Sequence, residues 1–147
     1  MKVRSLIPAL AMILMVLLPQ GALAEPSAAP ADSSSQLMRV LELTNAQRVA
    51  AGLLPLRWNQ ALSSAAAAHA GDMAARGYFA HNSPEGITPT DRAKAAGYEA
   101  YGWGGHYVGE NLARGYASSE DAFRGWMESP GHRANILNGK YREMGAA

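Results

Sequence analysis

Three polar residues have side chains that can bind a metal ion or move protons, and they lie far apart in the sequence: His81, Glu110 and His132. Each falls in an expected loop or at a helix end, where functional side chains are disproportionately found. Two imidazoles and a carboxylate around one cleft would suit a zinc-like divalent ion, or acid and base catalysis on a bound substrate. The alternative is that these side chains only cap helices and hydrogen-bond loops.

The spacing of the three residues matches no local metal motif such as His-Glu-x-x-His, so only the fold could bring them together. His132 follows Ser129-Pro130-Gly131, which predicts the start of a short helix running to Asn138. In the first turn of a helix the dipole disfavours the positively charged imidazolium, so we expect a neutral ring. Neutral imidazole is the form that a metal ion or a general base requires.

Composition excludes several other chemistries. The 147 residues include no cysteine, so disulfides, thiolate nucleophiles and cysteine-ligated zinc are absent, and any metal ion would rest on His, Asp and Glu. The formal net charge is +1, and Lys and Arg are scattered rather than clustered, so we expect no nucleic-acid partner. No serine lies in a Gly-x-Ser-x-Gly nucleophile elbow.

The first residues predict export. Lys2 and Arg4 precede an apolar run from Ser5 to Leu18, and Ala22-Leu23-Ala24 places small residues where a signal peptidase reads them. We interpret residues 1–24 as a cleaved signal peptide, because the apolar run is shorter than the ~20 residues that span a bilayer. After cleavage we expect no integral membrane span, and a location in the periplasm or the external medium.

Residues 25–34 are rich in Pro, Ala and Ser. Such a segment buries too little apolar surface to offset its ordering entropy, so it predicts a disordered linker. The folded domain is then expected over residues 35–147, a length typical of one domain.

Four helices, in addition to the short one that starts at Ser129, must position the candidate residues, and the third of the four is itself short. Helical spacing, capping residues and terminal glycine or proline predict helices from Ser33–Ser35 to Gly52, Asn59 to about Arg76, Thr88 to Gly97, and Ser118 to Pro130. The second of these is rich in alanine, which implies close approach to a neighbouring element.

Other polar residues are interpreted as structural. His69 lies on the apolar face of the alanine-rich helix and is expected to be a satisfied structural histidine rather than a ligand. His106 is expected in a solvated loop, although it could reach the cleft. Arg48 and Arg133 are expected to bind backbone carbonyls or acidic side chains.

Predicted strand content is low. Tyr107–Val108 and Asn111–Leu112 could form one short strand, and a second begins at Tyr141–Met144. The sequence ends at Ala147, which leaves no room for that second strand to pair and turn. We therefore expect either a domain lean in sheet or a truncated copy.

Three blocks resemble the signature blocks of the CAP superfamily, also called SCP: Phe79-Ala80-His81-Asn82, Gly109-Glu110-Asn111-Leu112-Ala113, and the run from Trp126 to Leu137. Upstream, Asn45 to Arg48 and Leu54 to Asn59 are similar to the family's opening helix and turn. The family contains cysteine-rich secretory proteins, antigen-five allergens and plant pathogenesis-related proteins. This chain resembles its cysteine-free bacterial branch, from about Leu37 to Gly145.

The resemblance implies an α+β fold, an α-β-α sandwich with helices on both faces of a small antiparallel sheet. It also implies a cleft with two histidines and two acidic residues, of which His81, Glu110 and His132 match three. Glu128 is nearest to the fourth position but one residue out of register, a rotation of ~100° around a helix, so its assignment stays open. The family's final strands have no counterpart, so we expect a domain incomplete at its C-terminus.

The resemblance implies a secreted extracellular binding module. Its cleft would hold zinc or another divalent cation through His81 and His132, with Glu110 nearby, and its surface would engage a lipid, sterol, glycan or protein. The alternative is a hydrolase of the cell envelope or extracellular space, in which the ion or His132 activates water and Glu110 moves the proton. Binding is favoured because the sequence shows no nucleophile and no complete set of four residues. Whether His81, Glu110 and His132 are catalytic stays open.

Overall fold

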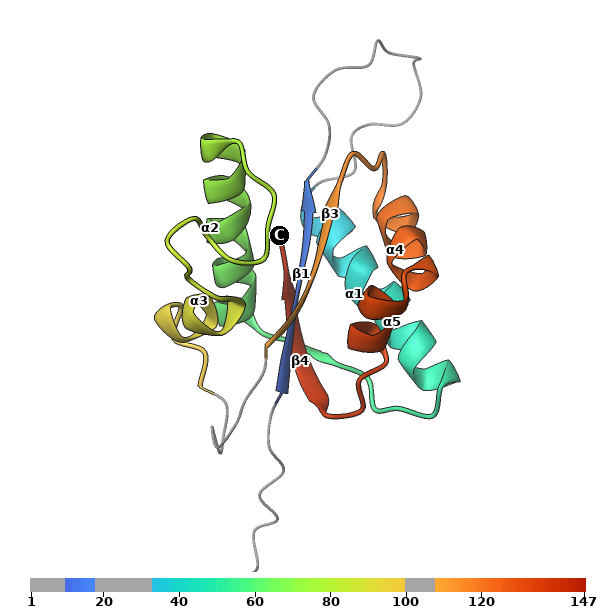
Figure 1. The fold of residues 1–147 in the computed structure, drawn as a ribbon. Helices are drawn as coiled ribbons and strands as arrows, with labels where there is room; N and C mark the ends of the chain where they lie inside the picture. Colours follow the sequence, from blue (N-terminus) through green and yellow to red (C-terminus); the bar gives the residue numbers. More distant parts are fainter. Residues whose placement is uncertain (1–9, 18–32, 100–107) are drawn as a thin grey trace, which may run out of the picture.

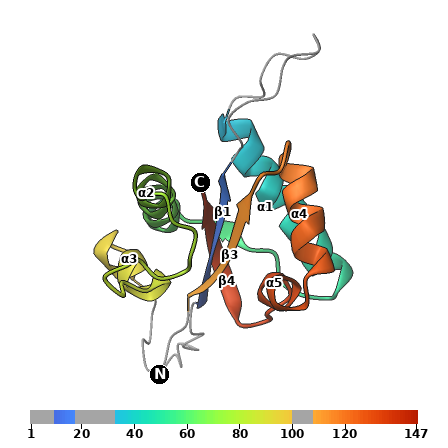
Figure 2. The same cartoon turned by 45° about the horizontal axis from the view of Figure 1, so that its top comes forward.

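The computed structural model of the chain describes residues 10–17, 33–99 and 108–147. The elements, in chain order, are β1 (Leu10–Leu17), α1 (Ser33–Ala50), β2 (Arg57–Trp58), α2 (Gln60–Arg76), α3 (Pro89–Ala95), β3 (Gly109–Arg114), α4 (Ser119–Glu128), α5 (Pro130–Ile136) and β4 (Tyr141–Ala146). Figure 1 shows α2 and α3 on one side of the sheet and α1, α4 and α5 on the other, and Figure 2 agrees. The expected α-β-α sandwich is confirmed.

The helices begin and end close to the residues that the sequence predicts. Asn59 caps α2 with its side chain, and the helix ends at Gly77, whose φ of 70° lies in the left-handed region. Thr88 and Asp91 form a complete capping box at α3, and the Ser118 side chain caps α4. α1 begins at residue 33, inside the segment predicted as linker, and α5 ends two residues earlier than predicted. Local capping chemistry therefore accounts for most of the helix boundaries.

The sheet has the strand order β2-β4-β1-β3, and each pair of neighbouring strands is parallel. The antiparallel sheet expected from the sequence is therefore wrong for the described strands. Neighbouring strands are joined through one or more helices, and such crossover connections make parallel pairs. The expectation that Tyr141–Met144 could not pair is also wrong, because β4 pairs with both β2 and β1.

The central strand β1 was predicted from the sequence as part of a signal peptide rather than as a strand. Leu10–Leu17 pairs with β3 on one side and with β4 on the other, and Ile13 lies opposite Glu110 in the register. The rest of residues 1–24, and residues 25–32 of the linker, lie outside the described residues. Cleavage after Ala24 therefore stays a prediction. That the domain is incomplete at its C-terminus also stays a prediction.

Buried apolar side chains fill both sides of the sheet. The larger cluster joins the sheet to α1, α4 and α5 and contains Val40, Leu56, Ala113, Ala122, Phe123, Trp126, Ile136, Tyr141, Met144 and Ala146. On the other side, α2, α3 and the residues just after α3 contribute Leu62, Ala65, Ala66, Ala93 and Tyr98. A Cβ on Gly145 of β4 would lie 2.2 Å from the backbone nitrogen of Ser63 in α2. The close approach implied by the alanine-rich helix is thus confirmed.

One charged residue belongs to the core. The Arg48 side chain is fully buried, and its guanidinium donates hydrogen bonds of 2.9 to 3.2 Å to four backbone carbonyls. The acceptors are the carbonyls of Leu54, Ile136, Asn138 and Tyr141. Burial, followed by the charge of Arg142, lowers the pKa of Arg48, but an arginine stays protonated at neutral pH. Arg48 therefore ties α1 to the loop that follows it, to the end of α5 and to the start of β4. The sequence predicted that Arg48 would bind backbone carbonyls or acidic side chains, and the acceptors are carbonyls.

None of the helices in the described ranges combines the length and hydropathy that a membrane span needs.

Candidate functional site

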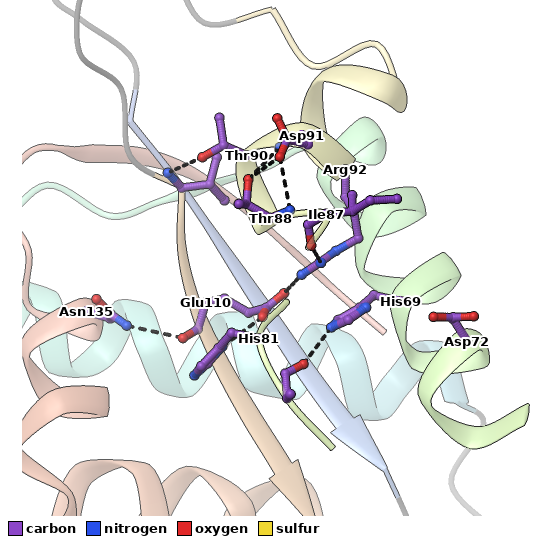
Figure 3. A network of polar contacts seen from close by, with 12 residues as sticks. His69, Asp72, His81, Ile87, Thr88, Thr90, Asp91, Arg92, Glu110 and Asn135 are labelled. Carbon is purple, nitrogen blue, oxygen red and sulfur yellow. Dashed lines mark hydrogen bonds and ion pairs between the residues drawn. The ribbon is translucent and has the colours of Figure 1, made fainter. Parts of the chain in front are cut away.

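The fold brings His81, Glu110 and His132 together although they come from three different parts of the chain. His81 lies in the loop between α2 and α3, Glu110 on β3, and His132 in the first turn of α5. His81 Nδ1 is 2.8 Å from Glu110 Oε1 (Figure 3). His132 is near enough to His81 for the charge on His81 to act on it. The structure thus brings together the three residues that the sequence singled out.

Glu110 is held from two sides. Its side chain is 1% exposed, and Oε2 accepts a hydrogen bond of 2.7 Å from Arg92 Nη2, opposite the contact with His81. The Arg92 side chain, 10% exposed, also donates from Nη1 to the carbonyl of Ile87, which fixes the cation to the loop before α3. Both carboxylate oxygens are therefore engaged, and Figure 3 shows Arg92 and His81 on either side of the carboxylate.

The contact with Glu110 orients the ring of His81. A carboxylate accepts hydrogen bonds, so Nδ1 of His81 carries the hydrogen in this contact. The Nε2 lone pair of the neutral ring is then available for another ligand, and the side chain is 54% exposed. A histidine that donates its second nitrogen to a carboxylate is the arrangement found at metal-binding histidines.

His132 is half-buried at the start of α5. Burial lowers the pKa of His132, and the positive charge of a protonated His81 lowers it further. The sequence predicted a neutral ring from the helix dipole. The direction agrees, but burial and a neighbouring imidazole are the causes that the structure identifies.

Two amides that sequence reasoning did not select join α5 to β3. Asn111 Nδ2 donates to the carbonyl of His132 at 3.1 Å. Asn135 Nδ2 donates to Asn111 Oδ1 at 2.9 Å and to the carbonyl of Glu110 at 3.3 Å. Both amides lie inside the blocks that carry the family resemblance, which is the signal that could have found them. They set the distance between the backbones of Glu110 and His132.

The family resemblance implies a second acidic residue in the cleft, and Glu128 is the nearest match to it in the sequence. Glu128 is exposed at the end of α4, and among residues 33–99 and 108–147 no hydrogen bond or ion pair joins it to His81, Glu110 or His132. Within the described part of the chain, no three or more His, Asp or Glu side chains are arranged to hold a metal ion. The assignment of Glu128 therefore stays a prediction.

His69 is a structural histidine, as the sequence predicted. It is 2% exposed, and its Nε2 donates to the carbonyl of Ala80 at 2.9 Å. Tyr78 also contacts His69, with 3.4 Å between the hydroxyl oxygen and Nδ1. Because Ala80 precedes His81, this hydrogen bond holds the loop that carries His81 (Figure 3). His106 and Tyr107 lie outside the described residues.

A separate pocket of about 440 Å³ lies between the start of α1, β2, α2 and the end of β4. It is lined by Ser34, Leu37, Met38, Trp58, Gln60, Ser63, Ser64, Ala67, Ala146 and Ala147. None of the three candidate site residues lines it. A molecule bound there would not touch the histidine cluster.

The sequence was compared with models of known protein families. Residues 41–147 match the family described as "CAP: Cysteine-rich secretory protein family". The chain belongs to this family. A CAP domain therefore carries the cluster of His81, Glu110 and His132, in a version without cysteine.

Relatives of this CAP domain occur in bacteria. The chain is 39% identical over 119 residues to the uncharacterized protein YkwD of Bacillus subtilis, covering 81% of the chain and 44% of that protein. It is 35% identical over 107 residues to the uncharacterized membrane protein YlbC of the same organism, covering 73% of the chain and 30% of that protein. The chain thus spans less than half the length of either relative.

Two solved structures share the CAP fold of this chain. An extracellular protein containing a SCP domain from Bacillus anthracis is 32% identical, with a TM-score of 0.69, over 76% of this chain and 36% of that one. An outer surface protein of Borrelia burgdorferi has a TM-score of 0.57 at 17% identity, over 74% of this chain and 77% of that one. The second similarity concerns the fold alone.

We expect His132 to titrate below the ordinary histidine value of about 6.5, because burial and the charge of His81 both disfavour its protonated form. At pH values between the lowered pKa of His132 in the folded chain and its ordinary pKa in the unfolded chain, the unfolded chain binds more protons than the folded chain. The contribution of His132 to stability is therefore complete above pH ~6.5 and is lost as the pH falls through the folded pKa.

An NMR titration of the imidazole signals in the presence of a chelator measures this shift. His81→Asn removes the neighbouring charge and is expected to move the pKa of His132 back toward the ordinary value. Glu42→Gln, an exposed substitution on α1, is the matched control and leaves the titration unchanged. A His132 that titrates at or above the ordinary value contradicts the prediction.

Proposed function

We propose that this CAP domain is an extracellular binding module that coordinates a divalent cation through the imidazoles of His81 and His132. The observation that carries the proposal is the 2.8 Å contact between His81 Nδ1 and Glu110 Oε1, which leaves Nε2 for a ligand. Glu110 is itself held by Arg92, so it acts behind His81 rather than as a further ligand. Imidazole nitrogen ligands suit zinc.

Two protein ligands leave coordination positions open for water or a bound molecule. A structural metal site is normally closed by four protein ligands, so an open site favours a role in ligand binding. The extracellular location is supported by the predicted signal peptide and by the similarity to an extracellular protein that contains a SCP domain. The proposed ligand is a lipid, sterol, glycan or protein in the periplasm or the external medium.

Calorimetric titration of the chelator-treated full chain with zinc chloride tests the cation site. We expect one zinc ion per chain. His81→Ala and His132→Ala should each weaken binding by at least about 100-fold, because each removes one of two imidazole ligands and with it at least ~3 kcal/mol of binding free energy. Circular dichroism of each variant checks that it is folded.

Glu42→Gln serves as a carboxylate control, because Glu42 is exposed on α1 and pairs only with Arg39 among the described residues. It should bind zinc like the original chain. Glu128→Gln tests the open fourth position: unchanged binding removes Glu128 from the ligand set. If the original chain takes up no zinc, or if both histidine variants bind as well as it does, the proposed cation site is wrong.

The hydrolase alternative is less favoured by the geometry. It needs Glu110 to move the proton, but both oxygens of this buried carboxylate are engaged by His81 and Arg92. A screen of zinc-loaded protein on peptides, esters and glycans, beside binding assays on liposomes, sterols and glycans, separates the two functions. Turnover that His132→Ala abolishes would reverse the preference for binding.

A further inference from the structure

The stretch of loop that carries His81 has few anchors to the rest of the molecule. Residues 79–82 are all exposed, and within the described part of the chain none of them makes a backbone–backbone hydrogen bond. The backbone of this stretch is held instead by a side chain, because the carbonyl of Ala80 accepts a hydrogen bond of 2.9 Å from Nε2 of His69. The residue that fixes the backbone next to His81 therefore lies on α2.

The loop and α2 are not closely packed beside this anchor. A pocket of about 220 Å³ lies between them and is lined by Ala68, His69, Asp72 and Arg76 of α2, by Ser83, Glu85 and Ile87 of the loop, and by Arg92 of α3. Most of these side chains are polar or charged. Apolar packing does not fix the loop across a pocket, so individual polar contacts decide where the loop lies.

The ring of His69 is itself fixed on α2. It is 2% exposed, and the Tyr78 ring packs edge to face against it, with 5.9 Å between the ring centroids. The Tyr78 hydroxyl donates to Asp72, one turn further along α2, and its oxygen lies 3.4 Å from Nδ1 of His69. Nε2 is therefore the nitrogen that reaches Ala80 (Figure 3). A buried ring held by packing and by its neighbours is a rigid support for an exposed loop.

We propose that His69 is a positioning residue for the cation site, because its hydrogen bond to Ala80 places the backbone from which His81 reaches Glu110. The inference rests on the proposed function, in which Nε2 of His81 binds the cation. Glu110 orients the ring of His81, and His69 places the residue that bears the ring. His69 acts through Ala80 and is not itself a ligand, since its Nε2 carries the hydrogen that the carbonyl accepts. Without this bond, His81 moves away from Glu110 for part of the time.

His69→Gln and His69→Asn form a matched pair that tests the hydrogen bond. Both side chains are neutral amides with N–H donors. The amide nitrogen of glutamine has about the reach of Nε2, whereas that of asparagine has about the reach of Nδ1, so only glutamine can replace the bond to Ala80. Calorimetric titration with zinc chloride should show affinity at least about 10-fold weaker for His69→Asn, and within about threefold of the original for His69→Gln.

Nitrogen NMR of the His81 ring without zinc separates a failure of this inference from a failure of the cation site. The spectra are recorded well above the ordinary histidine pKa of about 6.5, so that the ring is neutral. In the original chain and in His69→Gln, we expect the hydrogen on Nδ1, where the contact with Glu110 holds it. In His69→Asn, we expect an average of the two tautomers. A chain that takes up no zinc disproves the cation site, but this comparison still decides whether His69 positions His81.

Val40→Ala controls for a general loss of stability. Val40 is fully buried on α1, on the opposite side of the sheet from α2 (Figure 1). The variant should unfold at a lower urea concentration, because it leaves a cavity in the core, and should keep both the zinc affinity and the His81 tautomer.

Two results overturn the proposal. One is a folded His69→Asn variant in which the hydrogen of His81 stays on Nδ1. The other is a His69→Gln variant that loses this tautomer or does not fold, whatever His69→Asn does, because position 69 would then matter for packing and not for the bond to Ala80.

Discussion

Arg48→Met is expected to unfold the chain or to lower its free energy of unfolding by at least about 4 kcal/mol. Methionine fills much of the same space, so little packing is lost. The four carbonyls that Arg48 binds would each lose a donor in a buried or partly buried position. An unsatisfied buried polar group costs about 1–3 kcal/mol, and a domain has only about 5–15 kcal/mol in total.

Urea denaturation of the full chain, followed by tryptophan fluorescence, measures this effect. Arg57→Met is the matched control, because the Arg57 side chain is 78% exposed and its ion pair with Glu143 is long, at 3.6 Å. It should change stability by less than about 0.5 kcal/mol. Arg48→Lys should recover only part of the loss, because one ammonium cannot reach all four carbonyls. An Arg48→Met variant within about 1 kcal/mol of the original, a factor of roughly five in the equilibrium constant, contradicts the prediction.

Arg92→Met is expected to lower the free energy of unfolding by about 3–5 kcal/mol. The Glu110 side chain is 1% exposed and would lose the cation that lies 2.7 Å from Oε2. Removing one member of a buried ion pair leaves the other charge in a low-dielectric site, which is the main part of the cost. The contact between Glu110 and His81 remains, but the His81 side chain is 54% exposed, so it replaces little of the stabilisation that Arg92 gives to the buried carboxylate.

A double-mutant cycle shows whether this explanation is correct. Replacing both members of a buried pair by apolar residues is often nearly neutral, so Arg92→Met combined with Glu110→Met should recover most of the stability lost by Arg92→Met alone. Arg39→Met is the control, because Arg39 pairs with Glu120 and Glu42 at an exposed position. Its effect should be below about 1 kcal/mol. Additive effects of the Arg92 and Glu110 substitutions would show that the pair is not the cause.

The helices could be predicted because their determinants lie within a few residues of each other. The Asn59 side chain accepts a hydrogen bond from the amide of Leu62, three residues on, and the capping box joins Thr88 to Asp91 over the same separation. The positive φ of Gly77 likewise ends α2 locally. His81, Glu110 and His132 could be predicted as a group because the blocks around them resemble those of a family.

The tertiary structure alone decided which strands pair, and in which direction, because pairing joins segments that are distant in the chain. LAMILMVL is an apolar run that suits an export signal and a strand buried on both faces equally well, so its composition could not distinguish the two. The contact of Arg92 with Glu110 could not be predicted for the same reason. Its two residues lie 18 positions apart on a helix and a strand, and only their packing brings the opposite charges together.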